Sequence, residues 1–174
     1  MRKQHLAIPR KTSMPVSKKR RKLANASAEQ ATKKRLLTSP LARAEADRIV
    51  LHIRVGLEAI RSGHNDETAL LNLQSVVLLT EMLTAEGRGA LPLDMIRETG
   101  RQVVHLLEGG QDREQWTVPA ALSDALIAIV NEYDRIMHQV PLQAVLAATG
   151  KLERLEKDDP RYFRCMRDDE SAVR

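Results

Sequence analysis

Apolar residues recur every three or four positions in five stretches of this 174-residue chain. That spacing places them on one face of an α-helix, and turn residues such as Gly63, Pro92 and Pro141 separate the stretches. The pattern predicts an all-α protein, which we expect to be an up-and-down bundle of four to five helices. The predicted helices cover about residues 40–61, 66–86, 92–109, 119–140 and 142–157.

The second predicted helix is apolar around most of its circumference. Its apolar residues are Leu70, Leu71, Leu73, Val76, Val77, Leu78, Leu79, Met82 and Leu83. Such a helix usually lies at the centre of a bundle. Its apolar stretch, residues 70–83, contains polar residues and is shorter than the about 20 residues that span a bilayer. We therefore expect a cytoplasmic protein that does not associate with a membrane.

Residues 1–39 differ from the rest of the chain. Pro9 and Pro15 interrupt their first part, which has no apolar periodicity. Such a segment cannot bury enough apolar surface to offset its ordering entropy, so we expect a disordered arm. Residues 24–37 are alanine-rich and favour a helix, although an isolated helix of this length is marginal in water. The predicted organisation is a basic arm at 1–39, a helical bundle at 40–157 and a polar tail at 158–174.

Charge is distributed unevenly along the chain. Residues 1–40 contain 12 lysines or arginines and one acid, a net charge of +11, whereas residues 41–150 contain 9 basic and 15 acidic side chains, a net charge of −6. The remaining residues are neutral overall. A basic tail on an acidic body is typical of proteins that bind polyanions. The single cysteine, Cys165, excludes an internal disulfide and fits a reducing compartment.

The basic residues of the arm are the candidate nucleic-acid-binding residues. They are Arg10, Lys11, Lys18, Lys19, Arg20, Arg21, Lys22, Lys33, Lys34 and Arg35. Aligned along a phosphate backbone, they would release condensed counterions and give affinity that does not depend on base sequence. Two other interpretations remain open, since a cationic tail can also aid solubility or act as a targeting signal.

The sequence contains no recognisable catalytic motif. It has no P-loop, no G-x-G-x-x-G and no nucleophile elbow. Its five histidines, at positions 5, 52, 64, 105 and 138, do not form the i, i+4 pair of a helix-borne metal site. We therefore expect neither an enzyme nor a bound metal or cofactor.

A helix-turn-helix would allow base readout, and the best candidate for its turn is the segment Leu146–Gly150. The helix that would follow it contains Glu153 and Glu156, and phosphate would repel these acids. We interpret the segment as part of one bundle helix. Trp116, the only tryptophan, is a candidate partner-binding residue because tryptophan dominates binding hot spots. The alternative is that it packs over the end of the bundle.

The order of these segments resembles that of short proteobacterial proteins labelled Fis-type transcriptional regulators. The resemblance covers about residues 48–155. It includes a helix such as Leu51–Gly63, an apolar second helix such as Leu70–Gly87, a connection containing glycine and tryptophan before a helix such as Ala120–Gln139, and a final alanine-rich helix. This resemblance implies a DNA-associated regulator.

Together these features predict a non-enzymatic DNA-binding regulator or accessory factor, with DNA favoured over RNA. The bundle could pair as a homodimer or dock a partner. The alternative is a protein–protein adaptor whose bundle docks a partner and whose arm is only a solvated tail.

Overall fold

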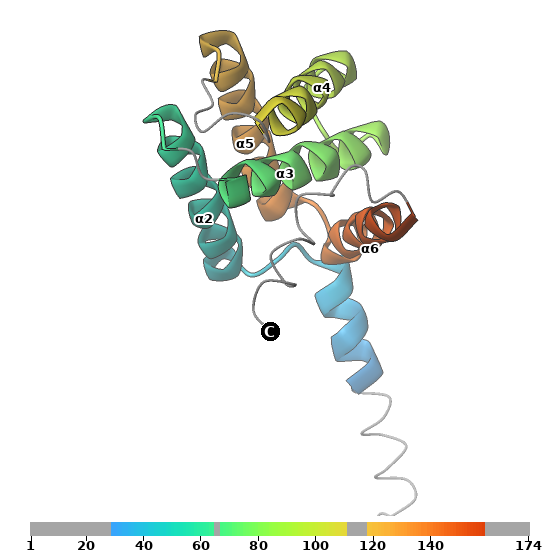
Figure 1. Cartoon of the computed structure of the whole chain (residues 1–174). Helices are drawn as coiled ribbons and strands as arrows, with labels where there is room; N and C mark the ends of the chain where they lie inside the picture. Colours follow the sequence, from blue (N-terminus) through green and yellow to red (C-terminus); the bar gives the residue numbers. More distant parts are fainter. Residues whose placement is uncertain (1–28, 65–66, 111–117, 159–174) are drawn as a thin grey trace, which may run out of the picture. The chain divides into compact units, whose positions relative to one another are not determined.

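The computed structural model describes residues 29–64, 67–110 and 118–158, and all regular structure in these ranges is helical. A first helix covers residues 29–38. It is followed by α2 (Arg43–Arg61), α3 (Glu67–Ala85), α4 (Leu93–Gly110), α5 (Ala120–Gln139) and α6 (Leu142–Asp158) (Figure 1). The predicted all-α class is therefore confirmed. The described part contains six helices rather than four to five, because the alanine-rich stretch ahead of Pro40 is also helical.

The chain divides into two units, one ending at Arg35 and the other beginning at Leu36. The helix over residues 29–38 ends just before Ser39 and Pro40. Proline disfavours helical backbone in the residue that precedes it, which explains the position of this end. Most side chains of this helix are exposed, so its ordering does not depend on a large apolar contact.

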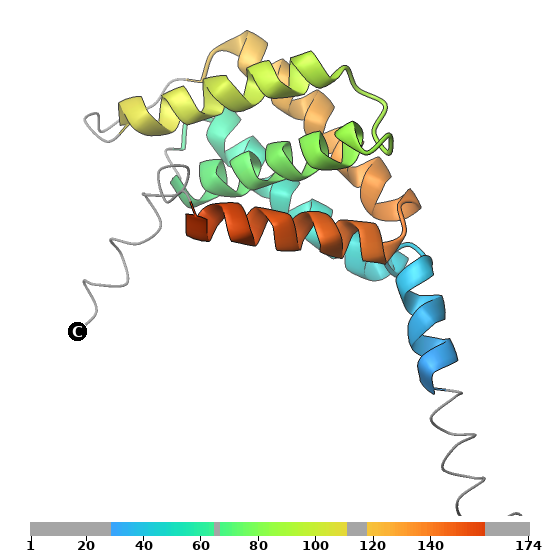
Figure 2. The same ribbon diagram turned by 90° about the vertical axis from the view of Figure 1, so that its right-hand side faces the viewer.

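Helix α3 is the centre of the bundle. It packs against α2, α4, α5 and α6, and Figure 2 shows it between α4 and α6, with α2 and α5 crossing behind them. Nine of its residues are buried, among them Leu70, Leu73 and Val77. The predicted central position is therefore confirmed. The expected up-and-down order, in which each helix packs on the next one, does not describe this arrangement because an all-round apolar helix needs neighbours on every side.

Of the described helices, α3 is the one that is long and apolar enough to cross a membrane. Its most apolar window is 56% buried inside the protein. Core helices have the same length and composition as membrane spans, and the surrounding helices explain the composition of α3 without a bilayer.

The apolar face of α5 forms another large part of the core. Its buried members are Leu122, Leu126, Ile129, Val130, Tyr133, Ile136 and Met137, and they continue into Val140. Val140 has extended backbone, and Pro141 separates α5 from α6. The amide of Leu142, the first residue of α6, donates to the carbonyl of Ser39 (2.8 Å). This bond attaches the start of α6 to the segment that precedes α2.

Glycines end two of the helices as expected. Gly63 after α2 has φ of 83° and Gly87 after α3 has φ of 76°, a left-handed conformation that other residues adopt at a steric cost. By contrast, Gly150 lies inside α6, which continues through it without a turn. The interpretation of this segment as one bundle helix is therefore confirmed.

Removing a core leucine of α3 tests its central role. Leu73 is 1% exposed, so Leu73→Ala leaves a cavity bordered by rigid neighbours and should lower the free energy of unfolding by about 2–5 kcal/mol. The control is Leu146→Ala on α6, where the side chain is 52% exposed and the loss should stay within about 0.5 kcal/mol. Urea denaturation followed by circular dichroism measures both. Equal losses in the two variants would contradict this account.

Candidate functional site

Three of the ten candidate nucleic-acid-binding residues lie in the described part of the chain. Lys33, Lys34 and Arg35 are exposed on the helix over residues 29–38. Successive helical residues are about 100° apart, so these cations spread over a broad sector of the helix surface rather than forming one row. Arg10, Lys11, Lys18, Lys19, Arg20, Arg21 and Lys22, together with Trp116, lie outside the described residues.

The arginines of the body are neutralised by carboxylates. Each arginine described between residues 41 and 150 lies within 3.9 Å of an aspartate or glutamate oxygen. Several pairs are local, such as Arg61 with Glu58, and others join two helices, such as Arg97 with Glu81 (2.9 Å). Exposed pairs contribute little to stability. Among the described arginines between residues 41 and 150, each charge therefore has a carboxylate close by.

A cluster of charged residues joins α2 to α5. His138 lies within hydrogen-bonding distance of the Asp134 carbonyl through Nδ1 (2.9 Å) and of the Asp47 carboxylate through Nε2 (2.9 Å). Arg54 donates to Asp134 (2.9 Å) and to Asn131 (3.0 Å). Both partners of His138 are acceptors, and only the imidazolium form has two N–H groups to donate to them.

These contacts raise the pKa of His138 above its ordinary value. The largest cause is the hydrogen bond to the Asp134 carbonyl, followed by the bond to the Asp47 carboxylate. The i, i+4 spacing of Asp134 and His138 is visible in the sequence, but the sequence analysis did not identify this cluster. Asp47 comes from a different helix, and only the tertiary structure brings it to the ring.

A second cluster attaches the α3–α4 connection to α5. The Glu132 side chain is 7% exposed. Its carboxylate accepts hydrogen bonds from the Ala90 amide (2.6 Å) and from two nitrogens of Arg135 (2.7 and 2.9 Å). Arg135 also donates to the Arg88 carbonyl (2.7 Å). The bond from Arg135 is the main reason that the pKa of Glu132 is below its ordinary value. The cluster therefore holds two backbone groups of the connection in place.

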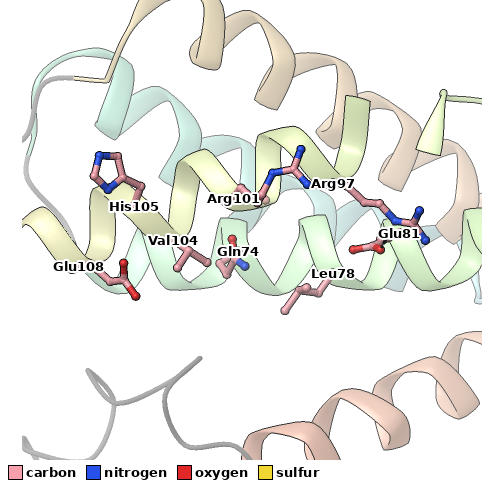
Figure 3. Close-up of a pocket in the computed structure, with 9 residues that line it drawn as sticks. Gln74, Leu78, Glu81, Arg97, Arg101, Val104, His105 and Glu108 are labelled. Carbon is pink, nitrogen blue, oxygen red and sulfur yellow. Dashed lines mark hydrogen bonds and ion pairs between the residues drawn. The ribbon is translucent and has the colours of Figure 1, made fainter. Parts of the chain in front are cut away.

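A pocket of about 400 Å³ lies between α3 and α4. Gln74 and Leu78 line it from α3, and Arg101, Val104 and His105 line it from α4 (Figure 3). Gln74 is 1% exposed, and its Oε1 atom is buried without a hydrogen-bond partner. The volume lies in the range of small-ligand sites. The lining offers paired cations, acids and two apolar side chains, but no nucleophile held by a base.

The described residues contain no group of three histidine, cysteine, aspartate or glutamate side chains that could hold a metal ion. His52, His64 and His105 are exposed and lie on separate elements. Neither the pocket nor the His138 cluster assembles the three or four ligands that a zinc site requires.

No protein-family model, no curated protein and no solved structure matches this chain. The resemblance to Fis-type regulators therefore stays a prediction.

The His138 cluster predicts a pH-dependent stability. Because the folded pKa is raised above the unfolded value, the stabilisation is fully present below about pH 6.5 and is lost as pH rises through the folded pKa. His138→Gln removes this contribution. We expect the difference in melting temperature between the wild type and His138→Gln to be largest near pH 6 and to shrink towards pH 9. A difference that stays constant across this range in differential scanning calorimetry would contradict the prediction.

The Glu132 cluster predicts the opposite sign. Its folded pKa is lowered, so its stabilisation is present above the unfolded pKa and is lost as pH falls through the folded pKa. Glu132→Gln removes the charge from hydrogen bonds to Arg135 and should lower the free energy of unfolding by about 1–3 kcal/mol at pH 7. Glu98→Gln, at an exposed pair within one helix, is the control and should change the stability much less, because solvent screens an exposed pair. Urea denaturation at pH 7 and pH 3.5 should show the Glu132 difference shrinking at the lower pH.

Proposed function

We propose that this protein is a non-enzymatic nucleic-acid-binding protein, a DNA-binding regulator or accessory factor of the cytoplasm, that contacts the phosphate backbone through its basic arm. The observation that carries the proposal is the contrast between the two parts of the chain. Twelve cations and one acid lie in residues 1–40, whereas each described arginine of the body between residues 41 and 150 has a carboxylate partner.

This contrast favours the arm over the body as the contact surface. Phosphate contact displaces condensed counterions from the nucleic acid, and that release favours binding. An arginine already paired with a carboxylate must give up its partner first, and an acidic body of net charge −6 repels phosphate. The exposed positions of Lys33, Lys34 and Arg35 are compatible with the proposed contact.

The proposed interaction is primarily a backbone interaction. Lysines and arginines on phosphates position a protein on the duplex but carry no base information. α6 is one uninterrupted helix, so the segment that offered a helix-turn-helix does not supply base readout. The resemblance to Fis-type regulators agrees with a regulatory role, and binding through the arm would bring the bundle to DNA.

The salt dependence of binding tests the proposal. Full-length protein should retain duplex DNA in a mobility-shift titration at about 50 mM salt and lose affinity steeply towards 300 mM. Replacing all five residues of Lys18–Lys22 by glutamine should reduce the slope of log K against log salt by up to about 4.5, because each phosphate contact contributes about 0.9.

The matched control removes the same amount of charge from the bundle. It replaces five body cations by glutamine: Arg43, Arg101, Lys151, Arg154 and Lys157. We expect this variant to keep the wild-type slope. An equal loss of slope in both variants, or no binding by the wild type at about 50 mM salt, would overturn the proposal.

A protein–protein adaptor is the second candidate, and the exposed leucines of α6 favour it. Leu146 is 52% exposed and Leu155 is 49% exposed. Nine residues apart on one helix, they lie on opposite faces, so each would be a separate contact point for a partner. Purification with and without nuclease separates the two candidates. A stoichiometric protein partner that is retained after nuclease treatment, and lost from Leu146→Glu or Leu155→Glu, would favour the adaptor.

A further inference from the structure

The outer face of α2 carries two large apolar side chains that none of the other described helices covers. Leu51 and Val55 are each 61% exposed. They lie on the side of the helix opposite the buried residues Ala46, Val50 and Leu57. Four residues apart on one helix, they stack on the same face and form one apolar patch rather than two isolated exposures.

The patch belongs to a regular stripe along α2. The stripe consists of Ala44, Arg48, Leu51, Val55 and Glu58 on the helix and of Ser62 directly after its end, all of them exposed. Their spacing alternates between four and three residues, which is the spacing of a coiled-coil seam. The inward face of the same helix already packs against α3 and α5. Helix α2 therefore has one seam directed into the bundle and a second seam directed outward.

Charges are arranged symmetrically on either side of the patch. On the N-terminal side of the patch, Glu45 pairs with Arg48, and on its C-terminal side Glu58 pairs with Arg61 (2.8 Å). Figure 1 shows α2 at the edge of the bundle. Read from N- to C-terminus the order is acid, base, apolar pair, acid, base. Reversing the helix direction places a base opposite each acid and the two apolar residues opposite one another.

We propose that the outer face of α2 binds the same face of a second copy of this chain, with the two helices antiparallel. In an antiparallel seam the layers would join Leu51 to Val55 of the second copy, and Arg48 to Glu58 of the second copy. Ala44 would face Ser62 of the second copy at each end. Every layer occurs twice, which is the condition for a two-fold symmetric interface.

The charge pattern selects this arrangement over a parallel one. A parallel seam would set Arg48 against Arg48 and Glu58 against Glu58, and both contacts are repulsive. The antiparallel seam converts both into attractions. Arg54, near the symmetry centre, donates to Asn131 and Asp134 on its own α5, so its charge is compensated within one copy.

The expected dimer is concentration-dependent. Two leucines and two valines form a small apolar centre, and the exposed ion pairs around it set register more than affinity. Dimerisation does not depend on the proposed nucleic-acid binding. If that proposal also holds, a dimer carries two basic arms and gains avidity on one duplex.

Sedimentation equilibrium of the full-length protein with charge-reversed variants tests the proposal. In Arg48→Glu alone both charged layers become acid against acid, and in Glu58→Arg alone both become base against base. Each variant should dimerise about tenfold more weakly than wild type. An equimolar mixture of the two variants restores an attraction in both layers, so it should form a heterodimer about as tight as the wild-type dimer.

Two controls keep this result specific. Leu51→Glu should abolish the dimer, whereas Leu146→Glu, at an exposed leucine of α6, should leave it unchanged, and circular dichroism should show both variants folded. A wild-type protein that stays monomeric at all accessible concentrations would overturn the proposal, as would a mixture no tighter than the separate variants. Rescue of Arg48→Glu by wild-type protein instead of by Glu58→Arg would contradict the antiparallel register.

Discussion

The burial of most of the α3 surface is the constraint on which the rest of the structure depends. A helix with leucine and valine around most of its circumference is stable in water only when other helices cover its apolar faces. Four neighbours do so here, and each must present an apolar face to α3. This requirement explains why the other helices are amphipathic, and it explains why the packing order departs from the order of the chain. Without knowledge of its neighbours, the composition of α3 fits both a core helix and a membrane-spanning helix.

The polar groups of the body fix how these helices meet. Glu132 and Arg135 hold the connection between α3 and α4 against α5, and His138 joins α5 to Asp47 on α2. Since an unpaired buried carboxylate is costly, Glu132 favours the one arrangement that provides its partners. Apolar burial supplies most of the driving force, while these contacts select among the ways of packing the same apolar faces.

The ratio of basic to acidic residues differs between the two parts of the chain, with a net charge of +11 in residues 1–40 and −6 in residues 41–150. In the body, each described arginine between residues 41 and 150 has an acid at short range. In the first forty residues a single acid accompanies twelve cations, so the composition of this part does not provide an acid for each cation. The proposed function of the arm rests on this contrast, whereas the proposed contact of α2 rests on the order of charges along one helix face.

The sequence by itself determined the secondary structure, because apolar periodicity, proline and glycine act locally. It predicted the five body helices nearly to their ends, the central position of α3 and the buried face of α5. It also determined the difference in net charge between residues 1–40 and residues 41–150, because this difference depends on the composition alone. It favoured a helix within residues 24–37, where the structure has one over residues 29–38, but the expected number of helices did not include it. It missed the clusters around Glu132 and His138. Only the tertiary structure decided which residues of different helices meet, since Asp47 and His138 are distant in the chain and no local rule pairs them. For the same reason only the tertiary structure showed that Leu51 and Val55 are left exposed on the outer face of α2.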